Sequence, residues 1–263
     1  MSNRIEEAAD CLARARLDRV PLSRLPDDLR PRDETEAYAV QRAIHRRLTA
    51  AGLGEVIGHK IGCTTPIMQT YLAIDHPCAG GMFAAAAHQE HADLGSADFR
   101  RLGVECEIAV RLSADLPVAG APYARDTVAG MVATCMAAIE LVDDRYQDYR
   151  AFDTPTLIAD DFFNAGCVLG REMEDWRALD LAALAGRMVI NGNDVGRGRS
   201  SDVLGHPFEA LAWLAGRAAQ DGQPLRAGKV VLLGSVVQTV WLQQGDHVSI
   251  EIERLGTASL QLS

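Results

Sequence analysis

The chain has 263 residues, of which 48% are hydrophobic and 24% are charged. This composition excludes a disordered, collagen-like or disulfide-scaffold protein. The 26 Lys and Arg residues against 36 Asp and Glu residues give a net charge of −10, which argues against binding to the phosphate backbone of a nucleic acid. A small anionic substrate is not excluded, because net charge does not describe a local site. The question is therefore whether some of the carboxylates point inward and bind a cation.

The six cysteines show no Cys-x-x-Cys spacing, which argues against a zinc site and a disulfide framework. We expect reduced thiols, most of them buried. The N-terminus has acidic residues in place of the apolar core of a signal peptide, and no apolar run reaches 18 residues. We therefore expect a cytoplasmic protein with no membrane contact.

Residues 1–55 predict a helical N-terminal region. Apolar residues recur at helical spacing from Ile5 to Ala15. After a proline-rich break, Asp33 is expected to cap a second helix, whose apolar face runs from Val40 to Leu48. Glycines at positions 52 and 54 are expected to end that helix.

Residues 56–263 predict a β-rich core with a few helices and no internal repeat, so that the chain forms effectively one domain. An Asn-Gly pair at residues 191–192 indicates a hairpin. His206 is expected to cap the helix that follows it. The predicted helices are Thr127–Ile139 and Pro207–Gln220, and the predicted strands are Val56–Gly62, Leu102–Leu112, Met188–Ile190, Val230–Leu233, Val236–Leu242, Val248–Ile252 and Ala258–Leu262.

Two carboxylates stand out in the predicted strand at residues 102–112. Because side chains alternate along a strand, Glu105 and Glu107 share one face and the apolar residues between and around them share the other. Taken alone, this pattern is more typical of a solvated acidic face, since a single Glu-x-Glu pair is a weak signal.

Glu140 lies in the apolar segment 136–142. Burying an isolated carboxylate costs several kcal/mol unless it is paired, protonated or bound to a metal. An ion pair with Arg145 or another base is therefore one explanation. The other is a site with Glu105 and Glu107, in which hard oxygen ligands without Cys or His would favour Mg²⁺ or Mn²⁺.

Lys60 lies in a short apolar run between Gly58 and Gly62. Both glycines share its face of the predicted strand, so they could leave room for a ligand. A lysine beside an acidic metal site can bind a substrate carboxylate or transfer protons. A solvated lysine is the more common fate of such a residue.

The sequence also resembles a known family, the 2-keto-4-pentenoate hydratases, which include the oxalocrotonate decarboxylases and are related to fumarylacetoacetate hydrolase. The matching motifs follow in order from Lys60 to the C-terminus. They are Gly58–Thr64, Glu105-x-Glu107, Ile139–Tyr146, Ile158–Asp160, Val168–Gly170, Leu204–Pro207 with Ala212–Leu214, and Val230–Ser235. The resemblance implies an α+β fold with a mixed β-roll core of the fumarylacetoacetate hydrolase C-terminal type, and a homo-oligomer.

The resemblance also implies a site. Glu105, Glu107 and Glu140 match the ligands of a divalent metal, usually Mg²⁺ or Mn²⁺, and Lys60 matches an active-site residue. Positions matching Asp160, Asn164 and Ser235 are expected to bind substrate. In this family a metal chelated by a 2-oxo acid acts as a Lewis acid that stabilises an enolate.

Two segments depart from the family pattern. Cys78 stands where the hydratases usually carry an aspartate that moves protons, and a thiol is mostly protonated at neutral pH. We expect Cys78 to occupy this catalytic position. Residues 161–164 contain Phe162 and Phe163 in place of small polar residues, which could narrow the pocket or rebuild its wall.

The expected function is that of a metal-dependent lyase, a hydratase of a small 2-hydroxy-2,4-dienoate in aromatic degradation. The expected partner is a small anionic 2-oxo acid. The alternatives are an oxalocrotonate-type decarboxylase, an acylpyruvate hydrolase, and a family member that has lost turnover.

Overall fold

The computed structural model describes residues 2–72 and 74–263. Its helices are α1 (Ser2–Leu17), α2 (Glu34–Leu48), α3 (Pro66–Leu72), α4 (Arg125–Ala129), α5 (Thr154–Ala159) and α6 (Pro207–Gln220). Its strands are β1 (Val56–Gly62), β2 (Cys78–Phe83), β3 (Ala87–Gln89), β4 (His91–Leu94), β5 (Leu102–Leu112), β6 (Val132–Asp143), β7 (Asn164–Leu169), β8 (Ala185–Ile190), β9 (Asn193–Arg199), β10 (Val230–Trp241), β11 (His247–Ile252) and β12 (Gly256–Leu262). None of the helices in the described ranges is long and apolar enough to cross a membrane.

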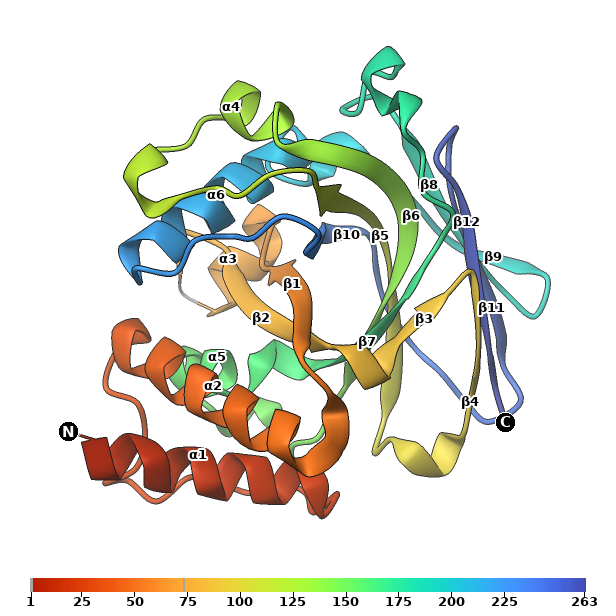
Figure 1. Cartoon of the computed structure of the whole chain (residues 1–263). Helices are drawn as coiled ribbons and strands as arrows, with labels where there is room; N and C mark the ends of the chain where they lie inside the picture. Colours follow the sequence, from red (N-terminus) through yellow and green to blue (C-terminus); the bar gives the residue numbers. More distant parts are fainter. Residues whose placement is uncertain (1, 73) are drawn as a thin grey trace.

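The strands form two mixed sheets (Figure 1). The larger sheet has the order β2-β1-β10-β5-β6-β7-β3, and the smaller has the order β4-β12-β11-β8-β9. Strands β11 and β12 of the smaller sheet contact β5 and β6 of the larger sheet. The centre of the larger sheet is therefore covered on one face, and the predicted mixed β-roll is confirmed.

The N-terminal helices α1 and α2 lie side by side along one edge of the molecule (Figure 1). Helix α2 begins after Asp33, whose side chain accepts a hydrogen bond of 2.9 Å from the Glu36 backbone N–H, as predicted. It packs in turn against α5. A contact across this packing comes from Gln41, whose amide donates to the carbonyl oxygens of Ala79 and Ile158 at 2.8 and 2.7 Å.

The predicted helix over residues 127–139 is wrong. Helix α4 ends at Ala129, and the segment from Val132 onward belongs to β6, which pairs with β5 on one side and β7 on the other. Strand β6 is buried along almost its whole length, including Ala137 and Ala138. A strand that is buried on both faces lacks the alternation of polar and apolar residues that identifies strands. The close packing of the two sheets accommodates small alanines, and this packing outweighs the helix propensity of those residues.

The other predictions about elements are largely confirmed. The hairpin at residues 191–192 joins β8 to β9. The helix at Pro207–Gln220 is α6, and the His206 side chain accepts from the Phe208 backbone N–H at 3.0 Å as its cap. The two strands predicted over residues 230–242 are one strand, β10, with an irregularity between Leu232 and Ser235. All six cysteines are free thiols, and Cys11 alone among them is exposed.

Candidate metal centre

The centre is built on two neighbouring strands of the larger sheet. In the antiparallel pair β5 and β6, Glu105 lies directly opposite Glu140. Residues that are directly opposite in such a pair point to the same face, and Glu107 follows Glu105 on that face. The prediction that Glu105 and Glu107 share a face is thus confirmed, whereas a fully solvated acidic face is not what the structure shows, because Glu107 and Glu140 are buried.

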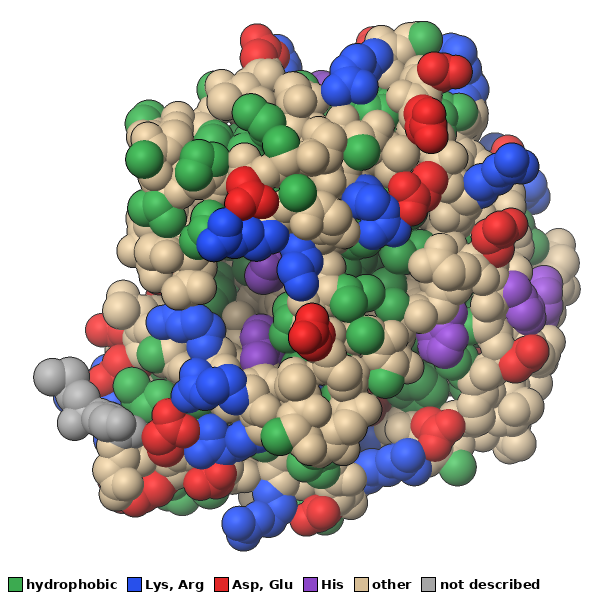
Figure 2. Space-filling model, in the orientation of Figure 1, with side chains coloured by type: hydrophobic (Ala, Val, Ile, Leu, Met, Phe, Trp, Pro, Cys, Tyr) green, Lys and Arg blue, Asp and Glu red, His purple; other side chains and the backbone are tan. Residues whose placement is uncertain are grey.

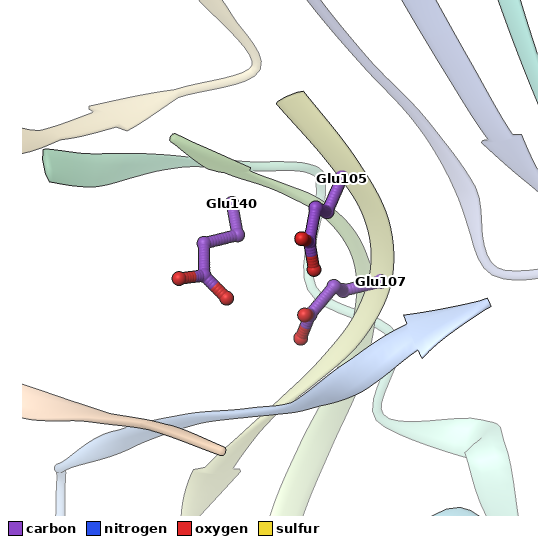
Figure 3. Close-up of side chains that lie close together, drawn as sticks. All are labelled: Glu105, Glu107 and Glu140. Atoms are coloured by element: carbon purple, nitrogen blue, oxygen red, sulfur yellow. The ribbon is translucent and has the colours of Figure 1, made fainter. Parts of the chain in front are cut away.

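The three carboxylates converge on one space (Figure 3). One ligand oxygen from each of Glu105, Glu107 and Glu140 lies within 4.8 Å of the others. Glu107 is fully buried, and 1% of Glu140 is exposed. Three carboxylates in such close contact repel one another, so the arrangement requires positive charge or protons.

The positive charge that the structure supplies is Lys60. Its Nζ lies 2.8 Å from Oε1 of Glu140, and both side chains are almost completely buried. The alternative that Glu140 forms an ion pair with a base is therefore confirmed, but the base is Lys60 and not Arg145, which binds Asp160 instead, at 3.0 Å. Lys60 is likewise not a solvated surface lysine. Three carboxylates against one ammonium leave two negative charges, which one divalent cation would neutralise.

Two groups from β10 hold the carboxylates of β5. The backbone N–H of Gly234 donates to Oε2 of Glu107 at 2.9 Å, and the hydroxyl of Thr239 donates to Oε1 of Glu105. Gly234 has a φ of 118°, and a Cβ at this position would lie 2.3 Å from Oγ1 of Thr64. Only glycine therefore lets the strand bend close enough to bind Glu107.

The remaining oxygen of Glu107 identifies the place for a cation. Oε1 of Glu107 is buried and has no hydrogen-bond partner in the described part of the chain. An unsatisfied buried carboxylate oxygen is costly, and a metal ion is one of the few groups that satisfies it. The residues present therefore fit Mg²⁺ or Mn²⁺, which prefer carboxylate oxygens and leave further positions for water or a substrate.

The protonation of the centre follows from its burial. Burial raises the pKa of Glu107 well above its ordinary value, and the charges of Glu140 and Glu105 add to this effect. Burial and Glu140 also raise the pKa of Glu105, although Lys60 and Thr239 act in the opposite direction. Burial alone would lower the pKa of Lys60, but the three carboxylates outweigh it and raise that pKa. Lys60 is therefore an ammonium at neutral pH, a donor and a positive charge.

Cys78 is the first residue of β2 and lies opposite Gly62 of β1, the neighbouring strand that also carries Lys60. It is fully buried. A hydrogen bond with the Cys63 thiol, together with burial, raises the pKa of Cys78 far above the ordinary thiol value. This thiol stays protonated at neutral pH, so it can donate a hydrogen bond but is not a base.

The two glycines around Lys60 have different roles. A Cβ on Gly58 would lie 2.0 Å from the Val230 carbonyl oxygen, so Gly58 permits the pairing of β1 with β10 and does not make room for a ligand. A Cβ on Gly62 would lie 3.6 Å from Nζ of Lys60 and 3.5 Å from the Phe162 ring. Only Gly62 therefore borders the site.

The three predicted substrate-binding residues have different surroundings. Ser235 lies opposite Glu107 in the sheet and next to the centre. Its hydroxyl donates to the Val237 carbonyl, and its proximity to Glu105 partly opposes the rise in the pKa of that carboxyl. The Asp160 carboxylate instead binds Arg145 and the Tyr146 hydroxyl, the latter at 2.8 Å.

Asn164 is buried, and its side-chain nitrogen has no hydrogen-bond partner among the described residues. Contact of Asp160, Asn164 or Ser235 with a substrate stays a prediction.

Sequence reasoning missed three residues that support the site. Thr239 holds Glu105, and Arg16 and His45 of the N-terminal helices bind Asp161 at 3.0 and 2.6 Å. The glycine in the middle of the predicted strand segment 230–242 was a signal for the bend at Gly234, because an isolated glycine in a strand often marks a bulge. No sequence pattern links Arg16 or His45 to a residue more than a hundred positions away.

The larger of two packed mixed sheets brings three carboxylates and a lysine together in one centre. These features define the class of the protein as a mixed-sheet fold with a carboxylate metal centre. The family described as fumarylacetoacetate (FAA) hydrolase C-terminal matches residues 83–263. The chain is 35% identical over 263 residues to the 2-keto-4-pentenoate hydratase of Paraburkholderia phymatum, covering 99% of this chain and 98% of that protein. It is 35% identical over 233 residues to the 2-hydroxyhexa-2,4-dienoate hydratase of Comamonas testosteroni, covering 87% and 86% of the two chains.

A solved structure has the same fold over the whole chain. It is the 4-oxalocrotonate decarboxylase from Pseudomonas putida G7 complexed with magnesium and adipate, with a TM-score of 0.93, 24% identity, and coverage of 100% of this chain and 98% of that one. The chain therefore belongs to the fumarylacetoacetate hydrolase family. Within that family it belongs with the 2-keto-4-pentenoate hydratases and oxalocrotonate decarboxylases, as its motifs indicate.

Proposed function

We propose that the protein is a metal-dependent hydratase of a small 2-hydroxy-2,4-dienoate, which it converts to a 4-hydroxy-2-oxo acid. The observation that supports this best is the group of converging carboxylates of Glu105, Glu107 and Glu140 beside Lys60, in a chain similar to curated hydratases along its whole length. A divalent cation bound by the three carboxylates would supply Lewis-acid polarisation of a 2-oxo acid.

The chain's own residues supply charge and protons. Lys60 is a buried ammonium next to the carboxylates and can bind the substrate carboxylate or donate a proton to the reacting carbon chain. Cys78 is the second catalytic candidate, as a neutral thiol that can donate a hydrogen bond. Lys60, Glu107 and Glu140 are buried, and the low polarity of their surroundings strengthens each of these interactions.

The acidic chain can still attract an anionic substrate. Figure 2 shows a face that is hollowed between α6 and α2, with Lys or Arg side chains and His side chains around the hollow. Local positive charge around an opening can steer a small anion despite a net charge of −10. We further propose that the protein is cytoplasmic, a homo-oligomer, and a single unit in which residues 1–55 pack on the core of residues 56–263.

Decarboxylation of an oxalocrotonate-type acid is the second candidate. It would use the same cation and the same polarised 2-oxo acid, and the overall fold matches that of a decarboxylase. Acylpyruvate hydrolysis additionally needs a base that activates water. The metal group contains three carboxylates and no histidine, so it does not favour this reaction over the other two.

One assay distinguishes these reactions. The protein is incubated with Mg²⁺ or Mn²⁺ and with 2-hydroxydienoates, oxalocrotonate and acylpyruvates, and the products are identified by NMR. Hydration of the dienoate, lost on adding EDTA, is the expected result. Carbon dioxide from oxalocrotonate alone, or pyruvate from acylpyruvates alone, would contradict the hydratase assignment. No turnover of any of them, with Mg²⁺ binding retained, would indicate a member that has lost activity.

A further inference from the structure

The segment that follows α5 has an unusual backbone. Asp161, Phe162 and Phe163 have φ values of 57°, 49° and 67°, so three successive residues with side chains adopt the left-handed conformation. Each such residue is strained, and the conformation persists only where the surroundings impose it. The contacts of this segment therefore indicate which side chain the strained backbone positions.

Asp161 fixes the segment. Its fully buried carboxylate accepts from Nη1 of Arg16 at 3.0 Å and from the backbone N–H of Gly81 at 2.9 Å, and it binds Nε2 of His45 at 2.6 Å. These partners come from α1, β2 and α2. The backbone is held equally closely, because a Cβ on Gly80 would lie 2.7 Å from the Asp161 carbonyl oxygen.

Because Asp161 is held in this way, the ring of the next residue, Phe162, has a defined position. Its centroid lies 5.5 Å from Nζ of Lys60, and its edge would lie 3.5 Å from a Cβ on Gly62. The Phe163 ring packs mainly against the rings of Tyr146 and Tyr149, at 4.9 and 5.6 Å, and meets the Phe162 ring edge-on at 5.9 Å. Only one of the two phenylalanines therefore borders the metal centre.

We propose that Phe162 is a specificity-determining residue, whose ring forms an apolar wall beside Lys60 that favours 2-oxo acids with an uncharged tail over those with a second carboxylate. This inference rests on the proposed function. A substrate held at the carboxylates by its 2-oxo acid end would extend the rest of its carbon chain from the ion pair of Lys60 and Glu140, of which Phe162 is the immediate neighbour.

The charges around the centre support this preference. Lys60, the cation next to the Phe162 ring, is already paired with Glu140 at 2.8 Å. A second carboxylate of the substrate would lie in a buried place against an aromatic ring, which supplies neither a hydrogen bond nor a positive charge. An uncharged tail would instead gain apolar contact with the ring.

A binding experiment tests this proposal separately from turnover. The probes are 2-oxohexanoate and 2-oxoadipate, which share the 2-oxo acid end and the number of carbons and differ in the terminal carboxylate. Calorimetry on Mg²⁺-loaded protein should show that 2-oxohexanoate binds at least about tenfold more tightly. Phe162→Ala should reduce this ratio at least about tenfold, because it removes the ring and keeps the same backbone conformation.

Phe163→Ala is the matched control, since it removes an equal ring from the neighbouring left-handed residue and should leave the ratio unchanged. Phe162→Leu keeps an apolar side chain and serves if the alanine variant does not fold; it should keep a preference for the uncharged tail. Equal affinities in the wild type, or the same ratio in wild type and Phe162→Ala, would overturn the proposal. Normal selectivity in a protein that hydrates none of the dienoates would instead count against the proposed function alone.

Discussion

Lys60 and Glu140 form an ion pair of 2.8 Å in a place where almost no surface of either side chain is exposed. The ion pair joins β1 to β6, which are not neighbours in the sheet. It therefore places an ammonium directly against a carboxylate of the metal centre, where it can act on a substrate without displacing the cation.

We expect Lys60→Met to lower kcat by about 10²–10⁴-fold while Mg²⁺ affinity is kept or increased, because a cationic proton donor is lost and no ligand is removed. Steady-state kinetics and calorimetric Mg²⁺ titration check this. The chain's other lysine provides the control: Lys229 donates to the Val56 carbonyl oxygen at 2.5 Å, and Lys229→Met should leave kcat unchanged. Unaltered kinetics in Lys60→Met would remove Lys60 from the mechanism.

Glu107→Gln should weaken Mg²⁺ binding at least about tenfold, because it removes the charge of a ligand whose Oε1 has no other partner in the described part of the chain. The measurement is the rise in melting temperature on adding Mg²⁺, together with a calorimetric titration. Glu251→Gln changes an exposed carboxylate on β11 and serves as the control. Full Mg²⁺ affinity in Glu107→Gln would show that the cation lies elsewhere.

The metal-free protein should lose stability as the pH rises. The folded state keeps protons on Glu105 and Glu107 at pH values at which the unfolded chain has released them, so unfolding releases protons. This contribution is fully present below the ordinary glutamate pKa of 4.5 and is lost as the pH rises through the raised pKa of the folded state.

Denaturant unfolding in EDTA, measured from pH 4.5 upward, checks this expectation. Glu107→Gln should show a shallower loss than the wild type, and Glu251→Gln should match the wild type. Mg²⁺ should stabilise the wild type more at high pH than at low pH, since it competes with protons for the same oxygens. A steeper loss in Glu107→Gln would contradict the assigned protonation.

Cys78→Asp should raise the rate of hydration, because it supplies a carboxylate at the position where hydratases usually have one. Cys78→Ser is the control, since it keeps a small, neutral side chain and should not increase the rate. Kinetics and melting temperature are measured together, because Cys78 is fully buried and an added charge there costs stability. A folded Cys78→Asp protein with no gain would mean that another group moves this proton.

The sequence allowed the metal centre to be predicted better than the strand that carries part of it. Glu140 stands out because it is a carboxylate among apolar residues, and this signal does not depend on secondary structure. The alanine-rich residues before it favour a helix locally, and only the pairing of β6 with β5 and β7 makes them a strand. The register that sets Glu105 opposite Glu140 is a long-range property of the sheet, which periodicity within one segment does not contain.

The binding of Asp161 by Arg16 and His45 has a consequence for chimeric proteins. The two N-terminal helices carry none of the predicted metal or substrate residues, yet two of their side chains determine how the wall beside Lys60 is set. Exchanging residues 2–53 with those of a relative, without residues 161–163, would combine Asp161 with helices that did not evolve together with it. Recombination within this family should therefore preserve selectivity only where both segments come from the same parent.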